Sequence, residues 1–156
     1  MKVNFKNYKP KYSTKFYDLN IEWLEKYFYV EDHDKEVLRN PEKYIINQGG
    51  IILFAEFKNH IIGTAALMPT KNKHTYELTK MAVNPNYRNK KIGQKILLKI
   101  ISTANKMKLK KIILYSNRKL ENAIHLYLKY NFKEINLEEN CPYDRANIKM
   151  KLCLSY

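Results

Sequence analysis

One stretch of the sequence decides the fold: Met81-Ala-Val-Asn-Pro-Asn-Tyr-Arg-Asn-Lys-Lys-Ile-Gly-Gln-Lys-Ile-Leu-Leu-Lys-Ile100. It starts as a short apolar strand, turns at Pro85, continues as a basic loop and ends in an amphipathic helix. The first N–H groups of a helix have no partner within the helix, so a strand and a loop that lead into a helix make a suitable site for phosphate. Many such units are purely structural, and this pattern becomes specific only in combination with a second segment of the chain.

That second segment lies further along the chain: Ser116-Asn-Arg-Lys-Leu-Glu-Asn-Ala-Ile-His-Leu-Tyr-Leu-Lys-Tyr-Asn-Phe132. In this order the two segments resemble the motifs of the GNAT superfamily of N-acyltransferases, which take their acyl group from acyl-CoA. The first segment is similar to the family's pyrophosphate-binding motif, and the second is similar to the motif that comes after it. Residues 19–28, 76–83 and 143–152 also resemble a bacterial branch of small single-domain members.

The resemblance implies the GNAT fold, an α/β (α+β) arrangement in which a mixed, mostly antiparallel sheet has helices on both faces, in the order β-α-α-β-β-β-α-β-α-β-β. Hydrophobic periodicity gives the same order of elements. It predicts strands at 2–7, 51–57, 61–68, 75–83, 112–115, 132–137 and 146–152, and helices at 12–27, 92–108 and 120–127. A further short helix is expected to have Asp34 as its N-cap and to be interrupted by Pro41. Lys58-Asn59-His60 is expected to connect the strands of a hairpin.

The composition predicts one globular, cytoplasmic domain over residues 1–156. The chain is 45% hydrophobic and 13% aromatic, which argues against disorder. No apolar run approaches the ~20 residues of a membrane helix, and the N-terminus lacks the apolar stretch of a secretion signal. Cys141 and Cys153 lack C-x-x-C spacing, so we expect both thiols to be reduced in the cytoplasm and no contact with a membrane.

The formal net charge of +14 raises the question of a nucleic-acid partner. The basic residues are mostly Lys and are scattered, and no recognition motif accompanies them. The charge is also uneven, because residues 18–42 hold eight acids and three bases, a net charge of −5. We therefore rank a nucleic-acid binder last among the candidate functions.

The resemblance implies a cradle for acetyl-CoA that is made largely of backbone. The strand at 79–83 is expected to splay from its neighbour and to offer main-chain groups to the pantetheine arm, while the loop at 88–93 presents N–H groups to the pyrophosphate. The residues expected to bind acetyl-CoA are Met81, Ala82, Val83, Arg88, Asn89, Lys90, Lys91, Ile92, Gly93, Gln94, Asn117 and Asn122. Asn117 is alternatively a helix-capping residue, and the two roles are compatible.

The cradle departs from the family's pattern at two positions. Lys91 stands where the family usually has Gly, and Asn89 stands where Gly is also frequent. Asn tolerates a positive φ, whereas Lys adopts it at a greater cost. Lys90 and Lys91 either attract the phosphates or are solvated surface residues.

Two residues are candidates for the proton transfers of an acyl transfer. Tyr127 corresponds to a tyrosine that commonly points its hydroxyl at the CoA sulfur in the family, so it is a candidate general acid; a tyrosine at helical spacing is otherwise a core residue. Glu77 corresponds to a general base in several histone-acetylating members. A strand glutamate is unfavourable by propensity, and the alternative for Glu77 is a solvent-facing edge charge.

Taken together, the sequence predicts an N-acetyltransferase in which an amine attacks acetyl-CoA directly, since no nucleophile arrangement suggests an acyl-enzyme. The four histidines lack ligand spacing, so no metal is expected. The alternative is a non-catalytic acyl-CoA-binding or regulatory module. Glu31, Asp32 and Asp34 are expected to line the acceptor side and to favour a cationic amine, unless they form a solvated helix face. Whether the chain forms a homodimer is left open.

Overall fold

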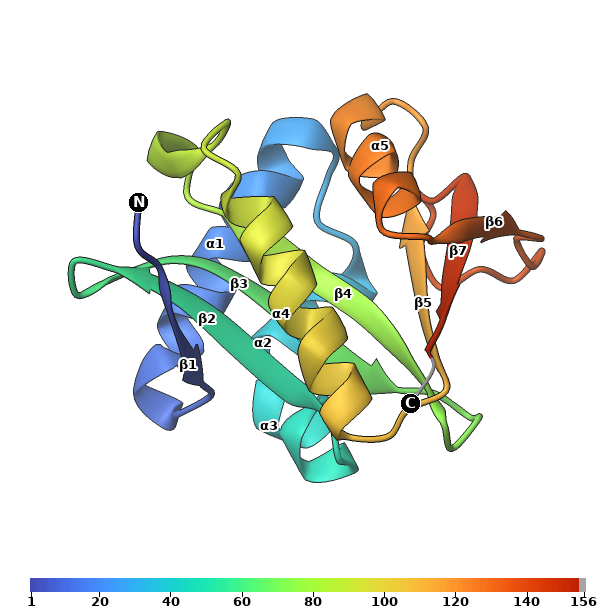
Figure 1. Ribbon diagram of the computed structural model, residues 1–156, viewed down its shortest axis with the longest axis horizontal. Coiled ribbons are helices and arrows are strands. Elements are labelled where there is room, and N and C mark those ends of the chain that lie inside the picture. The colour runs from blue at the N-terminus through green and yellow to red at the C-terminus, as the bar shows by residue number, and fades with distance from the viewer. Residues whose placement is uncertain (155–156) are drawn as a thin grey trace.

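The computed structural model describes residues 1–154 and arranges seven strands in one open sheet (Figure 1). The strands are β1 (Asn4–Asn7), β2 (Ile51–Phe57), β3 (His60–Pro69), β4 (Thr75–Val83), β5 (Lys111–Ser116), β6 (Lys133–Ile135) and β7 (Ile148–Cys153). Their order across the sheet is β1-β2-β3-β4-β5-β7-β6. Among the described strands, only β4 and β5 pair in parallel. The predicted mixed, mostly antiparallel sheet is confirmed.

Helices cover both faces of this sheet, as predicted (Figure 1). The described helices are α1 (Ser13–Tyr27), α2 (Asp32–Arg39), α3 (Pro41–Tyr44), α4 (Ile92–Lys106) and α5 (Glu121–Lys129). On one face α1 and α2 pack against β2 and β3 through a cluster that includes Phe16, Leu24, Val37 and Phe54. On the other face α4 and α5 pack on a larger cluster that includes Leu97, Ile100 and Ile112. The apolar stripes of the helices therefore point into two separate cores.

Two local predictions are wrong, and each has a structural reason. The β2–β3 hairpin turns over only two residues, Lys58 and Asn59, because both adopt a positive φ and His60 already pairs with Phe57. This is the geometry of a tight two-residue turn. The second helix has Glu31 rather than Asp34 as its N-cap. The carboxylate of Asp34 lies one turn further on and accepts a hydrogen bond from the Glu31 N–H at 3.0 Å.

A bulge and a divergence in β4 prepare the functional site. Lys80 adopts a φ of 55° within the strand, and the register between β3 and β4 shifts at this point. On its other side β4 pairs with β5 only from Thr75 to Glu77. Beyond Glu77 the two strands continue without pairing to each other, so within residues 1–154 the edge of β4 that faces β5 is left without a neighbouring strand. The splaying predicted for residues 79–83 is confirmed.

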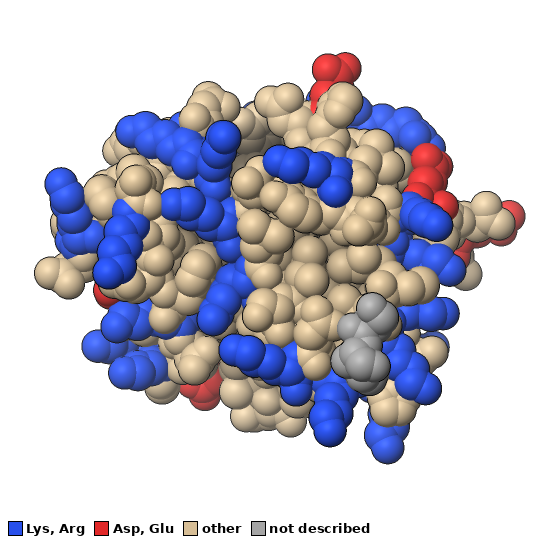
Figure 2. All heavy atoms as spheres, viewed as in Figure 1, with Lys and Arg blue, Asp and Glu red and all other residues tan. Residues whose placement is uncertain are grey.

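The positive charge of the surface is not gathered into one patch on the face that carries α4. Figure 2 shows Lys and Arg side chains spread over this face, at its rim and also left of its middle, with other residues between them. A phosphate-binding surface for nucleic acid would instead need clustered cations. The ranking of nucleic acid as the last candidate partner is therefore unchanged by this view.

Substitution of Gly50 by Ala is expected to destabilise the fold. An added Cβ at Gly50 would meet the carbonyl oxygens of Leu67 at 2.6 Å and of Ile45 at 2.9 Å, and backbone cannot swing aside as a flexible side chain can. We expect the free energy of unfolding to fall by about 2 kcal/mol, in the range of overpacked cores. Urea denaturation of the purified protein measures this change.

Gly93→Ala is the matched control, because an added Cβ there meets nothing within 4 Å. Because Gly93 lies in the first turn of α4, this exchange should change the free energy of unfolding by no more than about 0.5 kcal/mol. Equal urea midpoints for Gly50→Ala and the wild type would contradict the close contacts described for Gly50.

Candidate active site

A cleft of about 460 Å³ opens where β4 and β5 diverge. Its walls come from the end of α1, the β4–α4 loop, the first turn of α4, the start of α5 and the connection between β6 and β7. Of the residues predicted to bind acetyl-CoA or to transfer protons, all but Lys90 line this cleft. Lys90 is exposed, and its ammonium lies 5.8 Å from the ring centroid of Tyr87. The fold thus brings the candidate binding and catalytic residues into one place.

The loop before α4 has the backbone shape that an anion cradle needs. Asn89 and Lys91 have φ values of 62° and 61°, the left-handed conformation for which the family usually supplies Gly. Within residues 1–154, the N–H groups of Ile92, Gly93 and Gln94 have no hydrogen-bond partner. Because the space above Gly93 is open for 4 Å, a phosphate can approach these N–H groups.

Arg88 adds a cation with an unused donor at this end of the cleft. One guanidinium nitrogen, Nη2, forms an ion pair with Glu22 of α1. The other, Nη1, is buried and has no hydrogen-bond partner among the described residues. A buried donor without a partner is costly, and a phosphate oxygen would satisfy it. The residues present at this end therefore fit the pyrophosphate of a CoA molecule.

Tyr127 points from α5 into the cleft and is 8% exposed. Burial raises the pKa of its hydroxyl to about 12, so the hydroxyl is protonated at neutral pH. Among residues 1–154 the hydroxyl has no hydrogen-bond partner, which leaves its proton available to a ligand. The ring also packs on Phe132, with centroids 5.6 Å apart. The core position and the donor position that the sequence left as alternatives are therefore compatible.

Glu77 lies on a central strand and is 7% exposed, so the alternative of a solvent-facing edge charge is wrong. Its Oε2 accepts a hydrogen bond of 2.6 Å from the Tyr143 hydroxyl. Burial raises the pKa of Glu77, while the hydrogen bond from Tyr143 and the charge of Lys80 oppose this rise. A carboxyl whose pKa is moved towards neutrality suits a general base.

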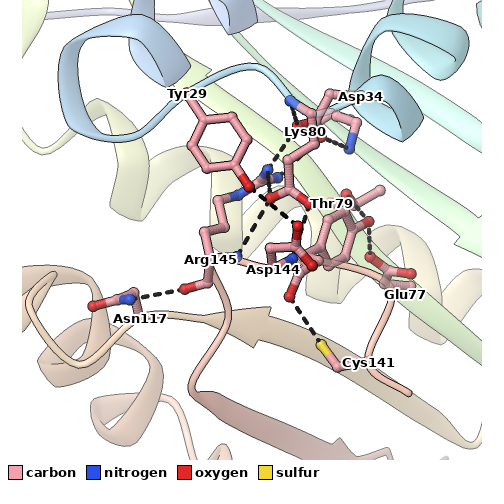
Figure 3. Close-up of polar contacts among 11 residues, drawn as sticks. Tyr29, Asp34, Glu77, Thr79, Lys80, Asn117, Cys141, Asp144 and Arg145 are labelled. Carbon is pink, nitrogen blue, oxygen red and sulfur yellow. Dashed lines mark hydrogen bonds and ion pairs between the residues drawn. The ribbon is translucent and has the colours of Figure 1, made fainter. Parts of the chain in front are cut away.

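The sequence did not reveal a buried ion cluster beside Glu77 (Figure 3). Lys80 Nζ lies 2.9 Å from Asp34 Oδ1, and both side chains are almost fully buried. The guanidinium of Arg145 contacts both oxygens of Asp34, at 2.7 and 3.0 Å, and also Glu31 at 2.9 Å. Burial opposes the ionisation of Asp34, but Arg145 and Lys80 outweigh it and lower its pKa from 3.8 to about 2. The one feature of the sequence that pointed to Arg145 in this cluster was the resemblance of residues 143–152 to the family's closing segment.

This cluster corrects the expectation about the acidic stretch. Glu31 and Asp34 are held in ion pairs with Arg145, and the lining of the cleft includes neither of them nor Asp32. Asp32 is exposed on α2. Acids whose charge is already neutralised exert little attraction on a distant cation, so Glu31 and Asp34 do not favour a cationic acceptor.

Asn117 and Asn122 both line the cleft but differ in their surroundings. The Nδ2 of Asn117 donates to the carbonyl of Arg145 at 2.8 Å, and its Oδ1 accepts from the Lys119 N–H at 2.9 Å. Asn117 therefore shapes the turn before α5, whose N-cap is Leu120. Asn122 is exposed at the rim, where its amide is free to reach a ligand.

Comparison with known proteins identifies the class of protein that this fold and cleft define. The model of the acetyltransferase (GNAT) family matches residues 16–132, and the chain belongs to this family. A search of curated proteins finds no sequence match. Membership implies acyl transfer from an acyl-CoA.

Three solved structures illustrate the similarity. A GNAT acetyltransferase from Staphylococcus aureus Mu50 has a TM-score of 0.86 and 27% identity, with 99% of this chain and 100% of that chain covered. An acetyltransferase from Streptococcus agalactiae has a TM-score of 0.82 and 22% identity, covering 97% and 98% of the two chains. The PaiA N-acetyltransferase of Thermoplasma acidophilum, solved in complex with coenzyme A, has a TM-score of 0.75 and 18% identity over 99% and 100%.

Two kinds of feature are absent from the described part of the chain. None of the helices formed by residues 1–154 is both long and apolar enough to cross a membrane. The same residues contain no group of three or more His, Cys, Asp or Glu side chains that could hold a metal ion.

The charge of Asp34 is expected to be essential for stability. Asp34→Asn keeps the size of the side chain but leaves Lys80 and Arg145 without a buried counter-charge, which typically costs about 3–5 kcal/mol. Asp32→Asn, two residues away and exposed, should cost less than about 1 kcal/mol. Urea denaturation of both variants at pH 7 tests this; similar losses would contradict the assigned role.

Acid provides a second readout of the same cluster. The folded pKa of Asp34 is about 2, below its usual 3.8, so its contribution is complete above about pH 4 and is lost as the pH falls towards 2. In Asp34→Asn this part of the acid dependence should be missing.

Proposed function

We propose that this protein is a cytoplasmic N-acetyltransferase that moves the acetyl group of acetyl-CoA to a primary amine by direct attack, and that residues 1–156 act as one GNAT domain. The observation that carries the proposal is the cleft itself. Where β4 and β5 diverge, an anion cradle at the start of α4, the Tyr127 hydroxyl and the Glu77 carboxyl face one space. This combination matches the needs of acyl transfer from a phosphorylated thioester.

Different parts of the cleft would hold different parts of acetyl-CoA. The free N–H groups at Ile92, Gly93 and Gln94, together with Arg88, would bind the pyrophosphate. The unpaired edge of β4 from Met81 to Val83 would hydrogen-bond with the amides of the pantetheine arm, as a further strand does at a sheet edge. Bound in this way, acetyl-CoA supplies the activated acetyl group as a thioester.

The reaction forms a bond between the amine nitrogen and the acetyl carbon and breaks the bond between that carbon and sulfur. Glu77 would accept the proton that the attacking amine loses. Tyr127 would donate a proton to the departing sulfur. The burial that raises the pKa of Tyr127 also raises that of a thiol in the same cleft, because both anions lose solvation. A hydrogen bond from Tyr127 would therefore stabilise the sulfur as it acquires charge.

Release of free thiol from saturating acetyl-CoA, measured across a panel of primary amines, tests the proposed activity. The proposal predicts release that depends on at least one amine and an equivalent amount of acetylated product. Binding of acetyl-CoA without release to any amine would instead favour the non-catalytic acyl-CoA-binding module.

Tyr127→Phe is expected to lower turnover about 10²-fold or more, the usual range for loss of a general acid. The affinity for acetyl-CoA should stay near that of the wild type, because the cradle is left intact. Steady-state kinetics with the best amine of the panel, together with titration of acetyl-CoA by calorimetry, separates the two effects.

Tyr130→Phe is the control for this substitution. Tyr130 is the C-cap residue of the same helix and lies outside the lining of the cleft. Loss of the Tyr130 hydroxyl should leave turnover within a factor of about two of the wild-type value. Wild-type turnover in Tyr127→Phe would assign Tyr127 to the core alone.

A further inference from the structure

Tyr143 makes two hydrogen bonds deep in the cleft wall, and these define the direction of its proton. Its hydroxyl lies 2.6 Å from Glu77 Oε2 and 3.1 Å from Thr79 Oγ1. A phenol has one proton, and a carboxylate can only accept. Tyr143 therefore donates to Glu77, and Thr79 donates to Tyr143. Tyr143 thus fixes Glu77 Oε2, and the side chain of Thr79 also interacts with the Glu77 carboxyl and lowers its pKa.

The ring of Tyr143 is held by charged neighbours. Lys80 Nζ lies 4.9 Å and Arg145 Cζ 4.7 Å from the ring centroid, within the range of cation–π contacts. Both cations are in turn bound by the carboxylate of Asp34. Asp34 belongs to α2, Lys80 to β4, and Tyr143 and Arg145 to the connection before β7. Three segments far apart in the sequence thus converge around one phenol. Figure 3 shows Asp34, Lys80 and Arg145 lying together.

We propose that Tyr143 is a positioning residue. Its hydrogen bond holds the Glu77 carboxylate in the orientation in which Oε1 receives the proton of the acceptor amine. The ion pairs of Asp34 with Lys80 and Arg145 hold these two cations against the ring of Tyr143 and so fix Tyr143 in turn. The inference rests on the proposed role of Glu77 as the base. A charge-assisted hydrogen bond of this length stabilises the carboxylate over the carboxylic acid. Tyr143 therefore acts on catalysis through Glu77, without touching the reacting atoms.

The pKa of Glu77 depends on the titratable groups that surround Glu77 and Tyr143. The titratable groups that face Glu77 and Tyr143 are Lys80 of β4, Tyr115 of β5, His33 and Asp34 of α2, and Cys141 and Arg145 of the connection before β7. Burial raises the pKa of Glu77, and the Tyr143 hydrogen bond lowers it. Removing the Tyr143 hydroxyl takes away one of the interactions that lower the pKa of Glu77, while the effect of burial remains, so this pKa should rise.

The test compares Tyr143→Phe with Tyr76→Phe. Tyr76 is the neighbour of Glu77 on β4, but its hydroxyl bonds to the Gly49 carbonyl at 3.1 Å and it does not line the cleft. The pKa of Glu77 is measured directly by ¹³C NMR of the glutamate carboxyls, with Glu77→Gln identifying the signal. The acidic limb of the pH–rate profile is measured in parallel.

In Tyr143→Phe both the pKa of Glu77 and the acidic limb should move upwards by about one pH unit or more, the effect of a lost hydrogen bond to a charged group. In Tyr76→Phe neither should move. An unmoved carboxyl signal in folded Tyr143→Phe would overturn the hydrogen-bond role, and a moved signal with an unmoved acidic limb would overturn the role in catalysis.

Two further measurements keep the test decisive. If Tyr143→Phe does not fold, Thr79→Val takes its place. It removes the bond that Thr79 donates to Tyr143 and the interaction of Thr79 with the Glu77 carboxyl, and because both favour the carboxylate, an upward shift of the Glu77 pKa is expected. No shift in Thr79→Val would then overturn the inference. Absence of thiol release by the wild type would overturn the proposed function, whereas release with an unmoved acidic limb overturns only the role of Tyr143.

Discussion

The pairing of β4 and β5 over three residues, and its loss beyond Glu77, is the constraint on which the rest of the structure depends. Parallel strands normally continue their ladder, because an unpaired buried backbone group is costly. Here the bulge at Lys80 turns β4 away, and the two strands frame a cleft between them. The free strand edge, the N-terminus of α4 and the start of α5 meet around that opening. The binding and catalytic candidates share one space because the sheet divides there.

The ion cluster of Asp34, Lys80 and Arg145 explains how such an opening is held in one shape. Removing charges from water is expensive, so a buried ion pair is weak evidence for stability in itself. These ion pairs form only between particular side chains, however, and they connect α2, β4 and the segment before β7 to one another. These segments form the wall that carries Glu77 and Tyr143. The charges therefore define positions within the wall, which an apolar contact of the same size would define less sharply.

The sequence predicted the elements well wherever local pattern controls them. Residues 81–100 were identified as strand, loop and helix, and the left-handed positions of Asn89 and Lys91 agree with the glycines they replace. The sequence did not predict that β7 lies between β5 and β6, because strand order depends on where the chain returns. For the same reason the sequence predicts Asp34 on the acceptor side of the cleft or on a solvated helix face, and not in a buried ion cluster. Its partners lie 46 and 111 residues away, and no local pattern links them.

The claim that the cleft binds an acyl-CoA through its phosphates is tested most directly by ligand-induced stabilisation. A ligand that binds the folded protein selectively raises the melting temperature by mass action. At equal concentrations, acetyl-CoA should raise the melting temperature far more than acetyl-pantetheine, which lacks the pyrophosphate that the start of α4 and Arg88 would hold. Equal stabilisation by the two compounds would contradict the account, because it would mean that the phosphates are not bound where the free N–H groups of α4 lie.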